Sequence, residues 1–102
     1  MVQAKFKGET LLGLVDTGSS ISALSTKFLY LVNNANRVDT LNVRVFNGTS
    51  FTSEGSADIN LDFGGFNMNI KNICLLSNLK YDFILGLPNI KTLEINNLKN
   101  KM

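Results

Sequence analysis

The chain has 102 residues, of which 44% are hydrophobic and 18% charged, and its formal net charge is +2. This length suits one domain spanning residues 1–102, and the composition favours a globular fold over disorder. The sequence contains no histidine and one cysteine, Cys74. It therefore excludes Ser-His-Asp and Cys-His nucleophile chemistry, an internal disulfide and a Cys/His zinc site. Cys74 lies in an apolar run, where we expect a core residue rather than a nucleophile.

The first third of the chain predicts three strands and one short helix. Alternation of apolar and polar residues predicts a strand at 2–6, Gly8-Glu9 suits a turn, and the apolar run 10–15 forms the return strand. Another short strand is expected at 20–24. Apolar residues near helical spacing predict a short helix over 25–32, with its first residue, a serine, as the N-cap.

Two hairpins are expected in the middle of the chain. Alternation from Leu41 to Val45 leads into Asn47-Gly48, a pair typical of a type I′ turn because both of its central residues need positive φ. The alternating segments 57–63 and 66–70 are separated by Gly64-Gly65 and predict the second hairpin.

The last third contains two apolar runs without alternation, at 73–76 and 83–85. Such runs predict strands covered on both faces. Pro88 suits the first turn of a short helix, and Leu93 with Ile95 would continue into a terminal strand. The chain thus reads as all-β with one or two short helices, and its strands at both ends suggest a domain of a longer polypeptide.

Asp16 stands out among the eight acidic residues. It ends the apolar run 10–15 and precedes Thr17-Gly18-Ser19-Ser20, and an acid in that position is costly unless the fold supplies partners. With no histidine, acid–base chemistry falls to carboxylates, lysines or tyrosines. The alternative, in which Asp16 only caps a turn, does not explain why so apolar a strand ends on an acid.

Two segments carry a resemblance to a known family. Val15-Asp16-Thr17-Gly18-Ser19-Ser20 resembles the active-site loop of aspartic proteases. Phe83-Ile84-Leu85-Gly86 resembles the strand that passes beside that loop in the family, where the glycine leaves room for it. The Asn47-Gly48 hairpin lies between them, where the family has its flap. This order covers nearly the whole chain and is similar to that of the retropepsins, the proteases of retroviruses and LTR retrotransposons.

The resemblance implies a retropepsin-like half-barrel with a flap, working as a two-fold homodimer. Two carboxylates held close together share one proton. Because the chain carries one Asp-Thr-Gly, the second Asp16 must come from a second copy. Water activated between the two Asp16 carboxylates would hydrolyse peptide bonds between apolar residues, with no metal or cofactor.

The implied substrate is the polyprotein of a retrovirus or LTR retrotransposon, processed inside the cell, in the cytoplasm or in retroviral-like particles. The expected partners are a second copy and a peptide or polyprotein. Nucleic acid is not expected, because the net charge is small. A membrane is not expected either, because no apolar run approaches the roughly 20 residues of a span and the start does not read as a signal peptide. A non-catalytic, domesticated retropepsin-like module for dimerisation or peptide binding is the alternative.

The resemblance also assigns residues to roles. Asp16, Thr17 and Gly18 would be catalytic, with Thr17 bonding across the dimer and Gly18 allowing close approach of its symmetry mate. Ser19 would donate to the Asp16 carboxylate and favour its charged form, which implies an acidic optimum; alternatively its hydroxyl bonds the local backbone. Residues expected to contact substrate are Ser19, Ser20, Ile21, Ala23, Phe46, Asn47, Gly48, Thr49 and Ile84.

The dimer contacts are expected to depart from those of many retroviral relatives. There an arginine after the Ile-Leu-Gly pairs with an acid after the active-site loop, whereas this chain has Leu87 and Ser20 at those positions. We therefore expect the dimer to depend on apolar contacts and on Thr17. Leu93, Ile95 and Leu98 would form an interchain sheet with the strand at 2–6, or else an edge strand within one chain.

Overall fold

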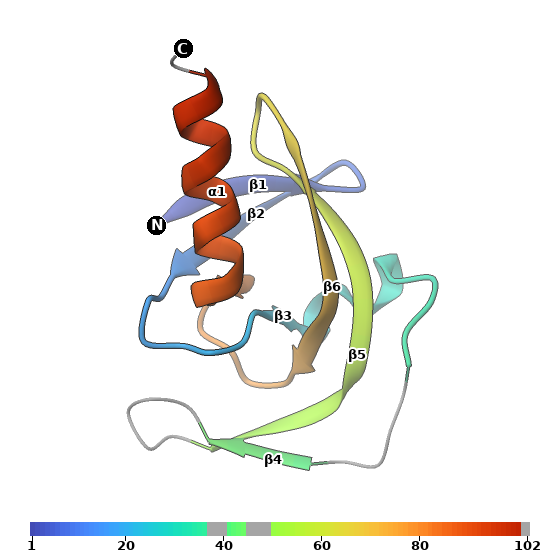
Figure 1. Cartoon of the computed structure of the whole chain (residues 1–102). Helices are drawn as coiled ribbons and strands as arrows, with labels where there is room; N and C mark the ends of the chain where they lie inside the picture. The colour runs from blue at the N-terminus through green and yellow to red at the C-terminus, as the bar shows by residue number, and fades with distance from the viewer. Residues whose placement is uncertain (37–40, 45–49, 101–102) are drawn as a thin grey trace.

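The structure, a computed structural model, describes residues 1–36, 41–44 and 50–100. In this part of the chain, seven strands form one sheet in the order β1-β2-β7-β3-β6-β5-β4, accompanied by one 3-10 helix and one α-helix. A further pairing of β1 with β5, at Lys5 and Asp62, curls the sheet back on itself (Figure 1). The predicted all-β class is confirmed.

The first hairpin joins β1 (Val2–Phe6) to β2 (Glu9–Val15). Phe6 pairs with Glu9, so the turn consists of Lys7 and Gly8, with φ values of 48° and 87°. Positive φ at both central residues is what a type I′ turn requires. The turn therefore lies one residue earlier than the predicted Gly8-Glu9.

The next elements are β3 (Ala23–Ser25) and the 3-10 helix η1 (Thr26–Leu31). The Ser25 hydroxyl accepts a hydrogen bond from the Lys27 backbone N–H at 3.3 Å, which confirms the predicted N-cap. The strand is shorter than the predicted 20–24 and shifted toward the C-terminus, because residues 16–22 form the loop described below.

Two long strands form the body of the sheet. β5 (Ser50–Asp62) pairs at its start with β4 (Leu41–Arg44) and further along with β6 (Asn67–Leu76). β6 runs unbroken through both segments predicted in this region, with a positive φ of 57° at Asn72. The two predicted hairpins are confirmed in their paired arms, whereas the Asn47-Gly48 turn lies outside the described residues.

The core lies between the curved strands and is filled by aliphatic and phenylalanine side chains. Phe83 belongs to β7 (Phe83–Leu85), which runs parallel to β2 and antiparallel to β3. Its ring is fully buried and packs against Gly13, where an added methyl group would lie 2.2 Å from the ring. Cys74 is only half-buried and its Sγ lies 3.3 Å from the Ser53 hydroxyl, so it is not the full core residue expected.

The C-terminal segment is a single α-helix, α1 (Leu87–Asn100). The predicted terminal strand of Leu93, Ile95 and Leu98 is therefore wrong, both as an interchain and as an intrachain strand. Ile90 is buried in the core and Leu93 packs against it, and this spacing of three residues suits a helix lying on the sheet. No glycine or further proline follows Pro88 to end the helix early.

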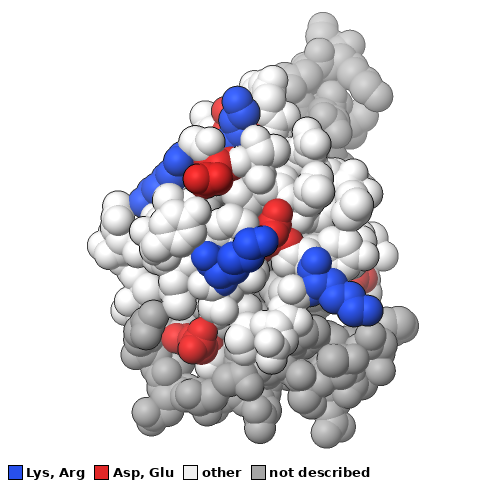
Figure 2. All heavy atoms as spheres, turned by 180° about the vertical axis from the view of Figure 1, so that it is seen from behind, with Lys and Arg blue, Asp and Glu red and all other residues white. Residues whose placement is uncertain are grey.

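The surface carries no concentration of one charge on the face seen in Figure 2, where cationic and anionic side chains are interspersed. Lys27 on η1 and Asp82, directly before β7, form an ion pair of 3.7 Å. None of the helices in the described part of the chain is long and apolar enough to cross a bilayer.

Candidate active site

Asp16 lies where β2 ends beside β7. The two strands run parallel, with Leu14 opposite Ile84 and Val15 opposite Leu85. The Asp16 backbone N–H continues this ladder by donating to the Leu85 carbonyl at 3.0 Å. The apolar Ile-Leu-Gly strand thus passes beside the acid loop, as the sequence predicts.

The loop after Asp16 is a tight turn closed by its own backbone. The Ser19 N–H donates to the Asp16 carbonyl at 3.1 Å, and the Gly18 N–H donates to Asp16 Oδ1 at 2.9 Å. The Asp16 side chain is half-buried, while Thr17 and Gly18 are exposed. The carboxylate is therefore oriented by the loop, and the tip of the loop is open to a partner.

Gly86 makes room for the loop on the side of β7. A methyl group at Gly86 would lie 2.1 Å from the Ile21 carbonyl oxygen, far inside contact distance. The Leu87 N–H donates to the Ser19 carbonyl at 2.8 Å. The expectation that this glycine allows the strand and the loop to approach each other is confirmed.

Two residues that contact the site were not singled out in the sequence, Ser22 and Asn89. The buried Ser22 hydroxyl accepts from the Gly86 N–H at 2.9 Å and donates to Asn89 Oδ1. Nothing in the sequence distinguishes Ser22 from the other polar residues before β3. Its partner Asn89 lies 67 positions further along the chain. The one available signal was a small hydroxyl residue inside an otherwise apolar segment.

The Ser19 hydroxyl does not reach the carboxylate as expected. It donates to the Ile21 carbonyl at 2.7 Å and lies 3.4 Å from the Ile21 N–H, which points toward it. The expected bond to Asp16 is wrong in the single chain, and the alternative of local backbone bonding is found. The hydroxyl bonds the local backbone because the turn places the Ile21 backbone within its reach.

The residues expected to contact substrate, besides Ser19, fall into three groups. Ser20 and Ile21 are exposed beside the loop, and Ala23 and Ile84 are opposite each other on β3 and β7. Leu24 and Phe83, the adjacent pair, belong to the core, so Ala23 and Ile84 point to the other face of the sheet. Phe46, Asn47, Gly48 and Thr49 lie outside the described residues.

Apolar side chains are exposed next to the loop. Ile21 is 36% exposed and Leu87 is 41% exposed, and both flank Ser19 through the hydrogen bonds given above. Exposed aliphatic side chains beside a loop with an open tip form a surface suited to a protein contact.

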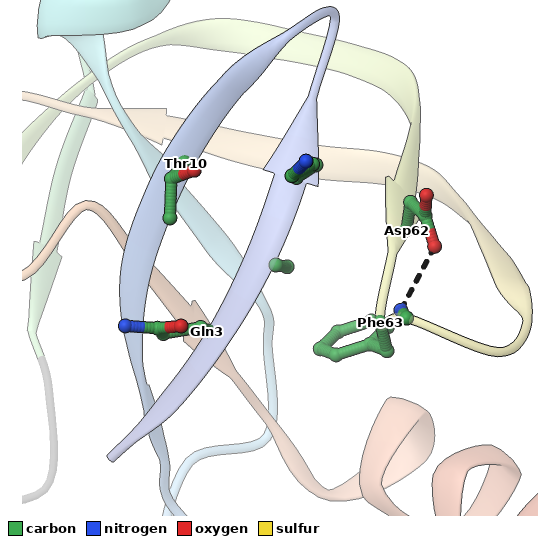
Figure 3. Close-up of a pocket in the computed structure, with 7 residues that line it drawn as sticks. Gln3, Thr10, Asp62 and Phe63 are labelled. Atoms are coloured by element: carbon green, nitrogen blue, oxygen red, sulfur yellow. Dashed lines mark hydrogen bonds between the residues drawn. The ribbon is translucent and has the colours of Figure 1, made fainter.

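The described surface has hollows beside the acid loop, lined in part by Ser20, Ile21 and Asn89, and away from it. One of about 300 Å³ lies between β1 and the end of β5, lined by Gln3, Thr10, Asp62 and Phe63 (Figure 3). Asp62 Oδ1 is occupied there by the Gly64 N–H at 2.9 Å. Within the described ranges, no group of three or more His, Cys, Asp or Glu side chains could hold a metal ion. The acid loop therefore remains the candidate site.

The comparisons with known proteins agree with this geometry. The family described as aspartyl protease matches residues 2–88, which includes the loop, the sheet and the start of α1. The chain belongs to this family. A search of curated protein sequences finds no match.

The fold of this aspartyl protease domain has a solved counterpart. The crystal structure of the retroviral protease-like domain of Ddi1 from Leishmania major matches with a TM-score of 0.68 and 16% identity, covering 89% of this chain and 74% of that one. The retropepsin-like fold expected from the sequence is confirmed. The seven-stranded sheet and the acid loop are thus features of an aspartyl protease domain.

Proposed function

We propose that this aspartyl protease domain is an aspartic endopeptidase that works as a homodimer. The observation that carries the proposal is an acid on an ordered loop with an open tip, present once per chain. One carboxylate of a pair takes a proton from water while its protonated twin polarises the peptide carbonyl. A single Asp16 cannot fill both roles, so the active site requires the second copy.

The exposure around the loop supports this assembly. Thr17 and Gly18 are open to solvent at the tip, so a symmetry mate can bring its own loop against them. Ile21 and Leu87 present apolar surface at the same place. Burying these side chains against their counterparts would contribute to association, in place of the ion pair of retroviral relatives.

The substrate we propose is an extended peptide with apolar side chains around the scissile bond. Extended peptides bind by pairing with strand edges, and pockets on alternate sides receive their side chains. Ala23 and Ile84 are opposite each other on β3 and β7; Ala23 is buried in the single chain, whereas Ile84 is half-buried and is the side chain we propose for an apolar pocket. The hairpin of β4 and β5 is the candidate flap, and a polyprotein is the candidate natural substrate.

The proposal is tested by measuring mass in solution together with peptidase activity. Activity on an apolar peptide at acidic pH should rise faster than linearly with protein concentration while monomers predominate, and pepstatin should inhibit it. Asp16→Asn should dimerise equally well and be inactive. Cleavage that persists in Asp16→Asn would overturn the proposal. Stable dimers with no cleavage would favour a dimerisation or peptide-binding module.

A further inference from the structure

The acid loop is tied to the end of β7 and the start of α1 by three hydrogen-bonded connections of two kinds. Two are made by backbone alone, from Asp16 N–H to the Leu85 carbonyl and from Leu87 N–H to the Ser19 carbonyl. The third passes through side chains, from Gly86 N–H to the Ser22 hydroxyl and on to Asn89 Oδ1. It is therefore the tie that a side-chain substitution can remove.

We propose that Asn89 is a positioning residue, which acts through Ser22 to set the separation between the acid loop and Gly86. This inference rests on the proposed peptidase function. The Ser22 hydroxyl has one proton, and Asn89 accepts it, so the lone pairs of the oxygen face the Gly86 N–H. Without Asn89 the hydroxyl is free to rotate, and the Gly86 N–H loses an oriented acceptor.

The consequence falls on the loop because the contact at Gly86 is so close. The Ile21 carbonyl lies against the Gly86 Cα, where there is no space even for a methyl group. Asn89 is itself held by α1, since its own N–H and that of Ile90 both donate to the Gly86 carbonyl at 3.1 Å. The first turn of the helix thus holds the Gly86 carbonyl directly and the Gly86 N–H through Ser22. A small shift of this unit would move the loop that carries Asp16.

The test compares Asn89→Ala with Asn89→Asp and with a matched control. Asn89→Asp keeps an acceptor oxygen at the same place. Asn60→Ala removes another amide that accepts one side-chain hydrogen bond, from Asn69 Nδ2 at 3.0 Å on the exposed face of β5 and β6. Two quantities are measured for each folded variant: kcat at protein concentrations that saturate dimer formation, and hydrogen exchange at the Gly86 amide.

We expect Asn89→Ala to lower kcat on the order of 10- to 100-fold, as misplacement of a catalytic group does, with KM nearly unchanged and faster exchange at Gly86. Asn89→Asp and Asn60→Ala should stay near wild type. Added to Ser22→Ala, Asn89→Ala should cause no further loss, because the two residues act as one unit.

Equal kcat in Asn89→Ala and Asn60→Ala would overturn the inference, whatever the exchange rates. So would a full additional loss in the Ser22→Ala background. If the wild-type dimer cleaves nothing, the proposed function fails, and the exchange at Gly86 still decides whether Asn89 orders this loop.

Discussion

Asp16 owes its position to the backbone around it. Its N–H is held by Leu85, its carbonyl by Ser19 and its carboxylate by the Gly18 N–H. Replacing the carboxylate by an amide leaves the first two bonds intact and keeps an acceptor oxygen for the third. Asp16→Asn is therefore a change of chemistry more than of structure, which makes it the key variant for this site.

Ser19→Ala should leave the acidic limb of the pH–rate profile where it is. The Ser19 hydroxyl donates to the Ile21 carbonyl, so its removal takes no hydrogen bond from Asp16. The measurement is kcat/KM against pH for both proteins. A limb that moves upward in Ser19→Ala would mean that the hydroxyl turns to the carboxylate in the active dimer.

Gly86→Ala should destabilise the domain by about 1–3 kcal/mol or more, the usual cost of inserting a group into a packed site. The added methyl would meet the Ile21 carbonyl, which is backbone and cannot rotate away. Gly65→Ala is the matched control, since nothing lies within 4 Å of a methyl group there. Denaturant unfolding of the two variants gives the comparison, and equal stabilities would contradict the described packing.

Among single residues, the sequence predicts the role of those that can be recognised from their neighbours along the chain. Asp16 to Gly18 form one motif, and Gly86 follows an apolar strand, so both could be found. Ser22 and Asn89 could not, because their partners lie 64 and 67 positions away. The Ser19 bond was predicted wrongly because two acceptors, one of them on the local backbone, compete for the same proton.

The strands and α1 differ in how far the sequence determines them. Alternation found the paired segments of β1, β5 and β6, because a strand with one buried face has to alternate. Pro88 located the start of α1, but its length depends on Ile90 docking on the sheet. Leu93 and Ile95, two positions apart, suit a strand equally well, so tertiary packing decides between the two.

Lys91→Pro tests whether the segment is a helix. Inside an α-helix a proline costs about 3 kcal/mol because it removes a hydrogen bond and clashes with the preceding turn. Lys91 is exposed, so Lys91→Ala should change stability little. Circular dichroism and thermal unfolding report both effects. A Lys91→Pro variant as stable and as helical as Lys91→Ala would contradict the helix.

Over the whole molecule, one chain presents an acid loop with exposed apolar neighbours. In the proposed dimer Leu87 is buried, so Leu87→Asp should raise the dissociation constant at least about tenfold, equivalent to about 1.4 kcal/mol. The monomer should remain folded, because an acid near a helix N-terminus is favourable. Sedimentation equilibrium measures the constant.

Tyr30→Asp is the control for this prediction, because Tyr30 is 69% exposed on η1 and is not expected at the dimer contact.

The retropepsin-like fold could be predicted from the order of motifs along the chain. The dimer contact stays a prediction of apolar character, and the terminal strand expected to help build it is a helix.

The most direct test of the paired acids is to mix wild-type protein with Asp16→Asn and measure activity per wild-type chain. At concentrations where dimers are complete, an equal amount of the variant should reduce that activity to roughly half, because about half of the wild-type chains then lie in mixed dimers with one carboxylate. Asp62→Asn, an exposed residue on β5, should cause no loss. Unchanged activity after full exchange with Asp16→Asn would show that one Asp16 suffices and would contradict the account.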